Sequence, residues 1–112
     1  MQLEEKKLVH DALKASESIR AFTTEKSFSD YRSDDMLRAA VERKFEIVGE
    51  ALNQLKKVNP TLIENVVDYH RIIAFRNVLI HGYAQVDDNL VWTVVQEKLP
   101  ELLKDLAGMI AS

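Results

Sequence analysis

The chain has 112 residues, a formal net charge of −3 and no cysteine, which excludes disulfide bonds and thiolate metal sites. Its length and its hydrophobic content of 46% suit one globular domain, residues 1–112, with a single core. Eighteen acidic residues against fifteen basic ones argue against a broad basic face for tight nucleic-acid binding, although a small cleft with local positive charge stays compatible.

The amino-terminal residues 1–7 are mostly charged and lack the apolar run of a signal peptide. No apolar stretch reaches the roughly 20 residues that a membrane-spanning helix needs. We therefore expect a cytoplasmic protein that does not enter a membrane.

The first predicted helix covers residues 3 to about 23, because apolar side chains recur there along one face. These side chains are Leu8, Ala12, Ala15, Ile19 and Phe22. A polar run follows and predicts a connection. Ser27 or Ser29 can then cap a short helical turn that contains Phe28 and Tyr31.

A long helix comes next, with Ser33 as its expected cap and with Asp34 and Asp35 in its first turn, where carboxylates are favourable. It should end near Val58, before Pro60. Apolar side chains form its predicted core stripe: Leu37, Ala40, Val41, Phe45, Val48, Ala51, Leu52 and Leu55.

Gly49 lies inside this long helix, where it costs about 1 kcal/mol relative to alanine, so we expect another helix to approach the backbone closely there. On a different face, Glu42, Glu46 and Glu50 follow one another at intervals of four. Neighbouring cations favour a solvated, salt-bridged face: Arg38, Arg43 and Lys44. No metal is expected, since the Glu-x-x-His pairs of a carboxylate metal site do not occur.

Pro60 is expected to start a short helix or turn over residues 60–65. A further helix should run from about Val67 to Gly82, because apolar, aromatic and arginine side chains recur there at helical spacing. This stripe consists of Tyr69, Ile72, Ile73, Arg76, Ile80 and Tyr83.

Asp87 or Asp88 should cap the last helix, whose apolar band runs from Leu90 to Ile110 and is broader than one neighbouring helix requires. Pro100 should kink or break this helix near its middle. Together these elements predict an all-α protein, an antiparallel bundle of four to five helices.

The residues with the richest chemistry are Arg76, His81 and Tyr83, which end the helix predicted before Gly82. Arginine offers fixed donors for phosphate oxygens, and histidine can move a proton near neutral pH, so the two together could cleave a phosphodiester without a metal. On an ideal helix, however, Arg76 and His81 point about 140° apart. Either the helix unwinds at Gly82, or two copies of the chain face each other across a two-fold axis and share the site. We favour the second arrangement.

The pattern Arg76-x4-His81-x-Tyr83 resembles the motif of the HepT-like toxins of the HEPN superfamily. Two further blocks resemble that family in the same order along the chain. One is residues 40–51, with the step Gly49-Glu50-Ala51, and the other is residues 86–92, at the start of the last helix. The resemblance extends over residues 3 to 110.

This resemblance implies a HEPN-like bundle that pairs as a two-fold homodimer, or assembles further, and acts as a metal-independent endoribonuclease. It also implies a partner, a minimal nucleotidyltransferase antitoxin, that silences the toxin by transferring AMP onto Tyr83. The chain itself would need no cofactor, since only the partner would use ATP.

The expected mechanism is attack by a ribose 2′-hydroxyl on the neighbouring phosphate. His81 would act as general base or acid, and Arg76 would stabilise charge on the phosphoryl oxygens. Asn77 could position His81 or the RNA, and Glu50 could orient Arg76.

Two alternatives stay open. The chain could be a non-catalytic helical binding partner of a nucleotidyltransferase, which the acidic net charge favours. It could also be a structural bundle unconnected with nucleic acid.

Overall fold

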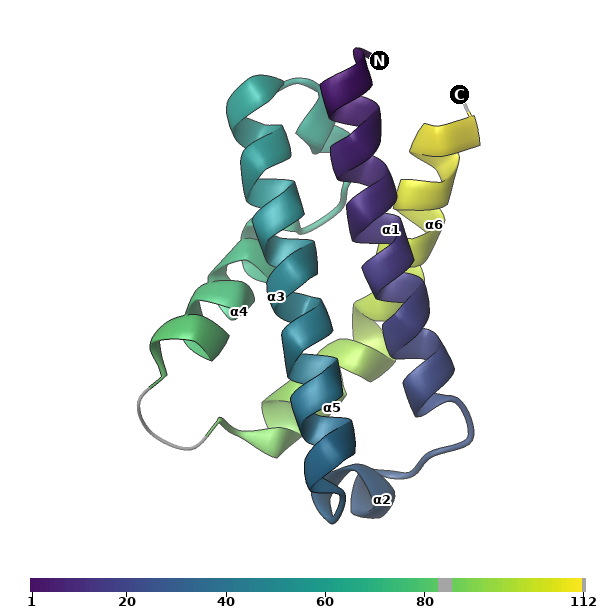
Figure 1. Ribbon diagram of the computed structural model, residues 1–112, viewed down its shortest axis with the longest axis vertical. Helices are drawn as coiled ribbons and strands as arrows, with labels where there is room; N and C mark the ends of the chain where they lie inside the picture. Colours follow the sequence, from purple (N-terminus) through teal and green to yellow (C-terminus); the bar gives the residue numbers. More distant parts are fainter. Residues whose placement is uncertain (83–85, 112) are drawn as a thin grey trace.

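The protein is described here from a computed structural model, which covers residues 1–82 and 86–111. Every regular element in these residues is helical, which confirms the all-α prediction (Figure 1). The elements are α1 (Leu3–Thr23), α2 (Phe28–Arg32), α3 (Asp35–Val58), a short 3-10 helix η1 (Leu62–Asn65), α4 (Tyr69–His81), α5 (Asp88–Glu97) and α6 (Leu99–Ala111).

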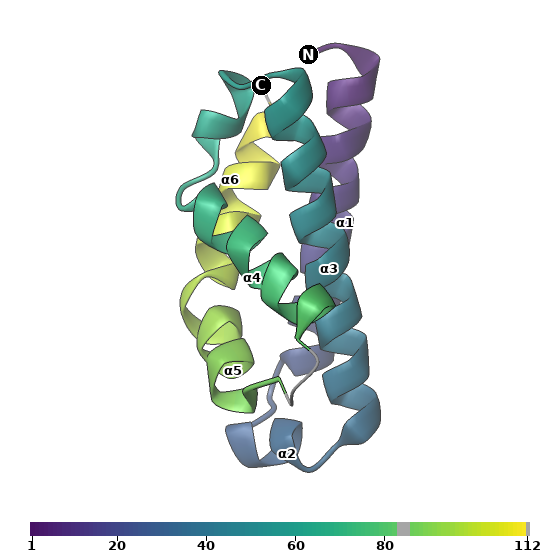
Figure 2. The same cartoon turned by 90° about the vertical axis from the view of Figure 1, so that its left-hand side faces the viewer.

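The two longest helices, α1 and α3, run antiparallel and form the spine of the bundle (Figure 1). Helix α6 lies along α1, and α4 packs on the other flank of α3. Figure 2 shows α4 crossing obliquely on the outside of the molecule, with its carboxyl end over α3 and no other element covering it. The bundle therefore presents one face of α4 to solvent.

One hydrophobic core joins these helices. In it, Phe45 of α3 meets Phe75 of α4 edge to face, with ring centroids 5.2 Å apart, and Tyr31 of α2 lies 5.3 Å from Trp92 of α5. Such aromatic pairs add about 0.5–1.5 kcal/mol to the burial of their area. The core thus fixes α4 against α3, and α2 against α5.

The predicted stripe of α1 is correct in its middle and wrong at its ends. Val9 and Thr23 are buried, whereas Leu8 is half-buried and Phe22 is 37% exposed. The contact face lies one residue further along than the apolar pattern indicates, because polar residues also occupy it. Ser16 and Thr23 do so by donating their hydroxyl hydrogen bonds to the helix's own carbonyls.

The cap of α3 is Asp34, not Ser33. The Asp34 carboxylate accepts a 3.0 Å hydrogen bond from the Leu37 backbone N–H, whereas the Ser33 hydroxyl donates back to the carbonyl of Ser29 and ends α2. The other predicted features hold: Ser27 caps α2, and α3 ends at Val58. Most of the predicted α3 stripe is buried, with Leu37 and Ala40 half-buried.

Pro60 starts a turn, as predicted, and the short helix follows this turn. It begins at Leu62, because the Asn59 side chain accepts the Leu62 backbone N–H at 3.0 Å and thereby sets its first turn. Helix α4 then starts at Tyr69, two residues later than predicted. Asp68 precedes it in the left-handed region, with φ 59°, which ends any continuous helix from Val67.

The buried face of α4 agrees with the predicted stripe at Tyr69 and Ile72 and differs from it further along the helix. Its core side chains are Tyr69, Ile72, Phe75 and Leu79. Arg76 instead lies on the flank of the helix, and Ile80 is 42% exposed. Tyr83, the last residue of the predicted stripe, lies outside the described residues.

The last predicted helix is divided in two, as Pro100 indicated. The break falls at Lys98, and Pro100 occupies the first turn of α6, where its missing N–H costs least. Asp87 caps α5 by accepting the Asn89 backbone N–H at 2.9 Å. Leu90, expected in the apolar band, is 42% exposed, because it lies in the first turn of α5 beyond the edge of the core.

No helix within the described ranges is long and apolar enough to cross a membrane.

Candidate active site

Helix α4 touches the backbone of α3 at Gly49. A Cβ atom placed there would lie 2.2 Å from Cβ of Arg76 and 2.6 Å from its Cγ, distances that no side chain could tolerate. The glycine therefore lets the carbon stem of Arg76 lie directly on α3. This confirms the close helix approach that the glycine predicted.

The guanidinium group of Arg76 is held from two helices. Its Nη2 donates to Glu50 Oε2 on α3 in a salt bridge, and its Nη1 donates to Asn77 Oδ1 on α4 at 2.9 Å. Gln54 in turn donates to the other oxygen of Glu50, at 3.2 Å. These contacts fix the direction of the guanidinium before any ligand arrives.

The Arg76 side chain is mostly buried, but its charged end can still be reached from solvent. The Arg76 side chain is 21% exposed, and its Nε is buried without a hydrogen-bond partner among the described residues. Glu50 is 46% exposed. An anion arriving from solvent could therefore reach the outer nitrogens of Arg76, although it would have to compete with Glu50.

Arg76 forms part of the wall of a hollow of about 360 Å³ between α1, α3 and α4. Arg43 also lines it, and Nη1 of Arg43 pairs with Glu46 at 3.3 Å. The hollow contains three carboxylates, those of Asp11, Glu46 and Glu50, against these two guanidinium groups. Its charge agrees with the acidic balance of the chain, so phosphate binding here must depend on the fixed Arg76 and not on a general positive field.

His81 is the last residue of α4, and its ring is exposed. Among the described residues, it is not part of the lining of the Arg76 hollow. His81 instead shares an exposed stripe of α4 with Ala74, Asn77 and Val78, at intervals of three and four residues. Arg76 and His81 therefore lie on different faces of α4, as expected for an ideal helix.

The chain matches the family model described as ribonuclease HepT-like over residues 12–108, which is most of its length. It belongs to the HepT-like ribonuclease family.

Relatives with this family name or activity match three quarters or more of the chain. A probable ribonuclease HepT of Thermococcus cleftensis is 33% identical, and the match covers 91% of this chain and 92% of that protein. An inferred RNase of Methanocaldococcus jannaschii is 30% identical, with 90% and 92% covered. Another, from Caldanaerobacter subterraneus, is 34% identical over 75% of this chain and 74% of its own length. No solved structure matches the chain.

The carboxylates of α3 in this HepT-like chain do not gather into one cluster. The row of Glu42, Glu46 and Glu50 is divided, because Glu46 pairs with Arg43 and Glu50 pairs with Arg76. Glu42 lines a different hollow. Among the described residues no three His, Asp or Glu side chains gather closely enough to hold an ion.

Two contacts of this HepT-like site were not predicted from the sequence. Gln54 was not singled out, although its position one turn after Glu50 is a signal for such a contact. Asn77 was expected to position His81 or the RNA, and its hydrogen bond from Arg76 was not anticipated. The proposed modification site, Tyr83, lies outside the described residues.

Proposed function

We propose that this HepT-like protein is a metal-independent endoribonuclease, the toxin of a toxin–antitoxin pair, which cleaves RNA at a site shared by two copies of the chain. The observation that carries the proposal is the pre-oriented Arg76 on the flank of α4 together with the exposed His81 at the end of the same helix. One of these groups is suited to hold a phosphate and the other to move a proton.

The exposed stripe of α4 supports pairing through this helix. It contains the small Ala74 and the 49% exposed Val78, and it ends at His81. A second α4 packed there would bury apolar surface and bring the two His81 rings together between the two Arg76 side chains. Two-fold pairing would thereby overcome the separation of Arg76 and His81 on a single helix.

Such a site would cleave RNA by transesterification. The ribose O2′ forms a bond to phosphorus as the bond from phosphorus to O5′ breaks, which leaves a 2′,3′-cyclic phosphate and a free 5′-hydroxyl. One His81 takes the proton of the 2′-hydroxyl, and the other, protonated, supplies a proton to O5′. Arg76 stabilises the charge that grows on the non-bridging oxygens, and Glu50 and Asn77 keep its guanidinium in place.

The experiment uses purified protein without AMP and a labelled single-stranded RNA. We expect cleavage with a cyclic phosphate end, and a loss of about 10²- to 10⁴-fold in rate for His81→Ala. His10→Ala is the matched control, because His10 is an exposed histidine of α1. Intact RNA with the unmodified protein, or equal cleavage by His81→Ala, would refute the nuclease.

AMP transfer to Tyr83 by a minimal nucleotidyltransferase would silence this site. Tyr83 follows His81 by two residues, so an added AMP would bring bulk and negative charge close to the catalytic groups. Intact mass after co-expression with a minimal nucleotidyltransferase should increase by AMP units, and the increase should be lost in Tyr83→Phe. An unchanged mass would remove this mode of regulation.

The acidic balance of the Arg76 hollow favours one other function, that of a non-catalytic helical partner for a nucleotidyltransferase. The same His81→Ala variant separates the two. If the protein is a nuclease, the variant loses RNA cleavage and toxicity but still binds the partner protein. If it is a docking module, the natural protein does not cleave RNA and the variant behaves in the same way.

A further inference from the structure

A second hollow, of about 590 Å³, lies between α2, α3 and the start of α5. It shares no lining residue with the hollow of Arg76. Its wall contains the Phe28 ring, two guanidinium groups, three carboxylates and the amide of Asn89. The function proposed above uses none of these side chains.

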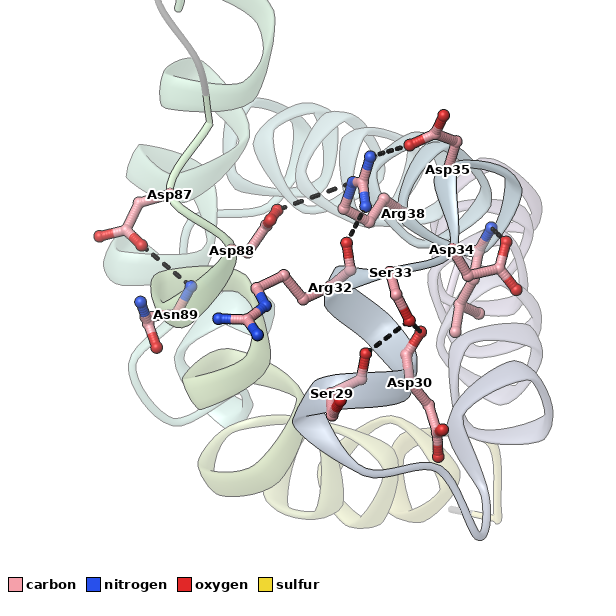
Figure 3. Close-up of polar contacts among 11 residues, drawn as sticks. Ser29, Asp30, Arg32, Ser33, Asp34, Asp35, Arg38, Asp87, Asp88 and Asn89 are labelled. Carbon is pink, nitrogen blue, oxygen red and sulfur yellow. Dashed lines mark hydrogen bonds and ion pairs between the residues drawn. The ribbon is translucent and has the colours of Figure 1, made fainter.

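Part of this polar set is already engaged in holding the fold together. Arg38 donates to Asp35 and to the backbone carbonyl of Arg32, and its Nε lies 4.0 Å from Asp88 (Figure 3). Asp87 caps α5. These contacts explain Arg38 and Asp87 as structural residues of the α2, α3 and α5 junction.

Arg32 is not engaged in the same way. Within the described residues its guanidinium has no ion pair, and it lies 5.7 Å above the centre of the Phe28 ring. Figure 3 shows it extending from α2 towards the start of α5, where Asn89 lies. The result is a flat cationic surface, backed by an aromatic ring, at the edge of a hollow.

Glu42 is a second group without a partner. It is half-buried, and its carboxylate makes no hydrogen bond or ion pair to any described residue. Burial raises its pKa, and the negative charges of Asp88 and Glu46 raise it further, against the opposing effect of Arg38. The Glu42 oxygens are not among the buried atoms that lack partners, so they reach the solvent of the hollow and can accept N–H groups of a ligand there.

The charges of the hollow decide between ligand classes. Two guanidinium groups face three carboxylates, so the site does not favour a phosphate or another anion. A neutral, flat ring with both donors and acceptors fits better. RNA bases are such rings, and proteins bind unstacked bases on arginine planes and read their edges by hydrogen bonds.

We propose that this hollow binds an unstacked guanine of the RNA substrate, an inference that rests on the proposed nuclease function. The base stacks on the guanidinium plane of Arg32, and Glu42 accepts its adjacent N1–H and N2–H donors. The Asn89 amide donates to O6. Adenine would present an acceptor to Glu42, and uracil and cytosine lack the pair of adjacent donors, so guanine is the base that satisfies the set.

The hollow is within reach of the cleavage site. Val86 lines it and follows His81 by five residues, so their Cα atoms are at most about 18 Å apart. A few nucleotides of extended strand cover that distance. A guanine bound here would therefore lie a few nucleotides from the cut, where it would give the enzyme a sequence preference.

A binding experiment tests the hollow without cleavage. The probes are 2′-O-methyl pentanucleotides of uridine with guanine, adenine, cytosine or inosine at the centre, titrated into the His81→Ala protein and followed by amide NMR shifts. We expect the guanine probe to bind about tenfold tighter than the adenine probe and to shift the Arg32 and Asn89 amides. Inosine, which lacks the N2 amine, should fall in between.

Three variants assign the contacts. Glu42→Gln should reduce the preference for guanine to within about twofold, because it replaces one acceptor by a donor. Arg32→Lys should weaken the binding of all probes, since lysine keeps the positive charge but lacks the flat guanidinium group on which the base stacks. Arg20→Ala, which removes an exposed cation outside this hollow, should change nothing. Equal affinity for the four probes, or a guanine preference that survives Glu42→Gln, would overturn the proposal.

Cleavage of a random RNA pool gives the second measurement. Guanine should be enriched at one position near the cut, and Glu42→Gln should remove the enrichment while cleavage continues. Cuts without base preference overturn the guanine site and leave the nuclease intact. Absent cleavage refutes the nuclease, and the binding titration then decides by itself whether the hollow prefers guanine. If Arg32→Lys and Glu42→Gln instead block AMP transfer and leave RNA binding unchanged, the hollow is a docking site for the nucleotidyltransferase and the guanine proposal is wrong.

Discussion

Arg76 combines two contacts that are usually made by different residues. Its carbon stem packs on Gly49, and its charged end bonds to Glu50 and Asn77. The motif was enough to single out Arg76 and His81 from the sequence, and Glu50 was considered as a side chain that could orient Arg76. The direction of Asn77 could not be read in advance, because adjacent helix positions do not share a face and only the rotamers decide whether they meet.

Glu50→Gln should separate orientation from affinity in RNA cleavage. The variant keeps the shape of the side chain and removes its charge, so Arg76 loses a fixed anionic partner. We expect kcat to fall about 10-fold or more, since small displacements of catalytic groups are costly. KM should not rise, because removing a negative charge from the site does not weaken the binding of negatively charged RNA. Glu46→Gln, whose parent carboxylate pairs with Arg43, is the control and should leave kcat unchanged.

Asp68 gives a pH-dependent contribution to stability. The hydrogen bond from Lys98, 2.6 Å long, lowers the pKa of Asp68 below its usual 3.8, and the charges of Lys98 and Arg71 act in the same direction. The folded protein therefore binds this proton less readily than the unfolded chain, so the stabilisation is present above pH 4 and disappears as the pH falls through the lowered pKa.

Asp68→Asn should remove that stabilisation and keep the backbone, since asparagine also tolerates the left-handed conformation at φ 59°. We expect a lower urea midpoint than the natural protein at pH 7 and a smaller difference at pH 3. A difference that does not change between the two pH values would show that the charge of Asp68 is not its cause.

Most helix ends could be predicted from capping residues and prolines. Ser27, Asp87 and Pro100 each act where the pattern indicated. The cap of α3 was misplaced by one residue, because Ser33 and Asp34 are both good caps and only the geometry of the preceding turn chooses between them.

The second half of the predicted α4 stripe was wrong for a different reason. This helix has apolar residues around much of its circumference, so the period alone cannot identify which stripe meets α3. In the structure Phe75 and Leu79 are buried, whereas Val78 is 49% exposed and Ile80 is 42% exposed.

Gly49→Ala tests the contact between α3 and α4. The added methyl would overlap Arg76 Cβ, so the helices must separate, at a cost of about 1–3 kcal/mol that outweighs the gain of up to 1 kcal/mol in helix propensity. We expect a lower free energy of unfolding, measured in urea. Gly108→Ala in α6 is the control, because its methyl would meet nothing within 4 Å, and it should be stabilising by about 0.5–1 kcal/mol. Equal effects of the two substitutions would contradict the close contact.

For the whole molecule, the exposed stripe of α4 predicts a dimer. Val78→Lys places a charge in the middle of this stripe, so we expect light scattering to show a change from twice the mass of one chain to a single mass, with cleavage lost. Leu3→Lys changes an apolar residue of α1 that is 83% exposed and should have no effect.

Mixing the natural protein with His81→Ala tests whether the copies share one site. When equal amounts are unfolded and refolded together, half of the dimers contain one chain of each kind and keep a single His81. If the site needs both histidines, the cleavage rate should fall to about a quarter of that of the natural protein alone. A fall to about one half would show that each chain acts by itself.

The contact at Gly49 limits how this protein can lose its reactivity in evolution. Because the arginine stem is also the spacer between two helices, a short residue at position 76 would open a gap in the scaffold and endanger folding. Long uncharged residues such as glutamine or methionine would instead fill the same space without the guanidinium. We therefore expect homologues that have lost catalysis but still fold to carry glutamine or methionine at position 76 and to keep the glycine at position 49.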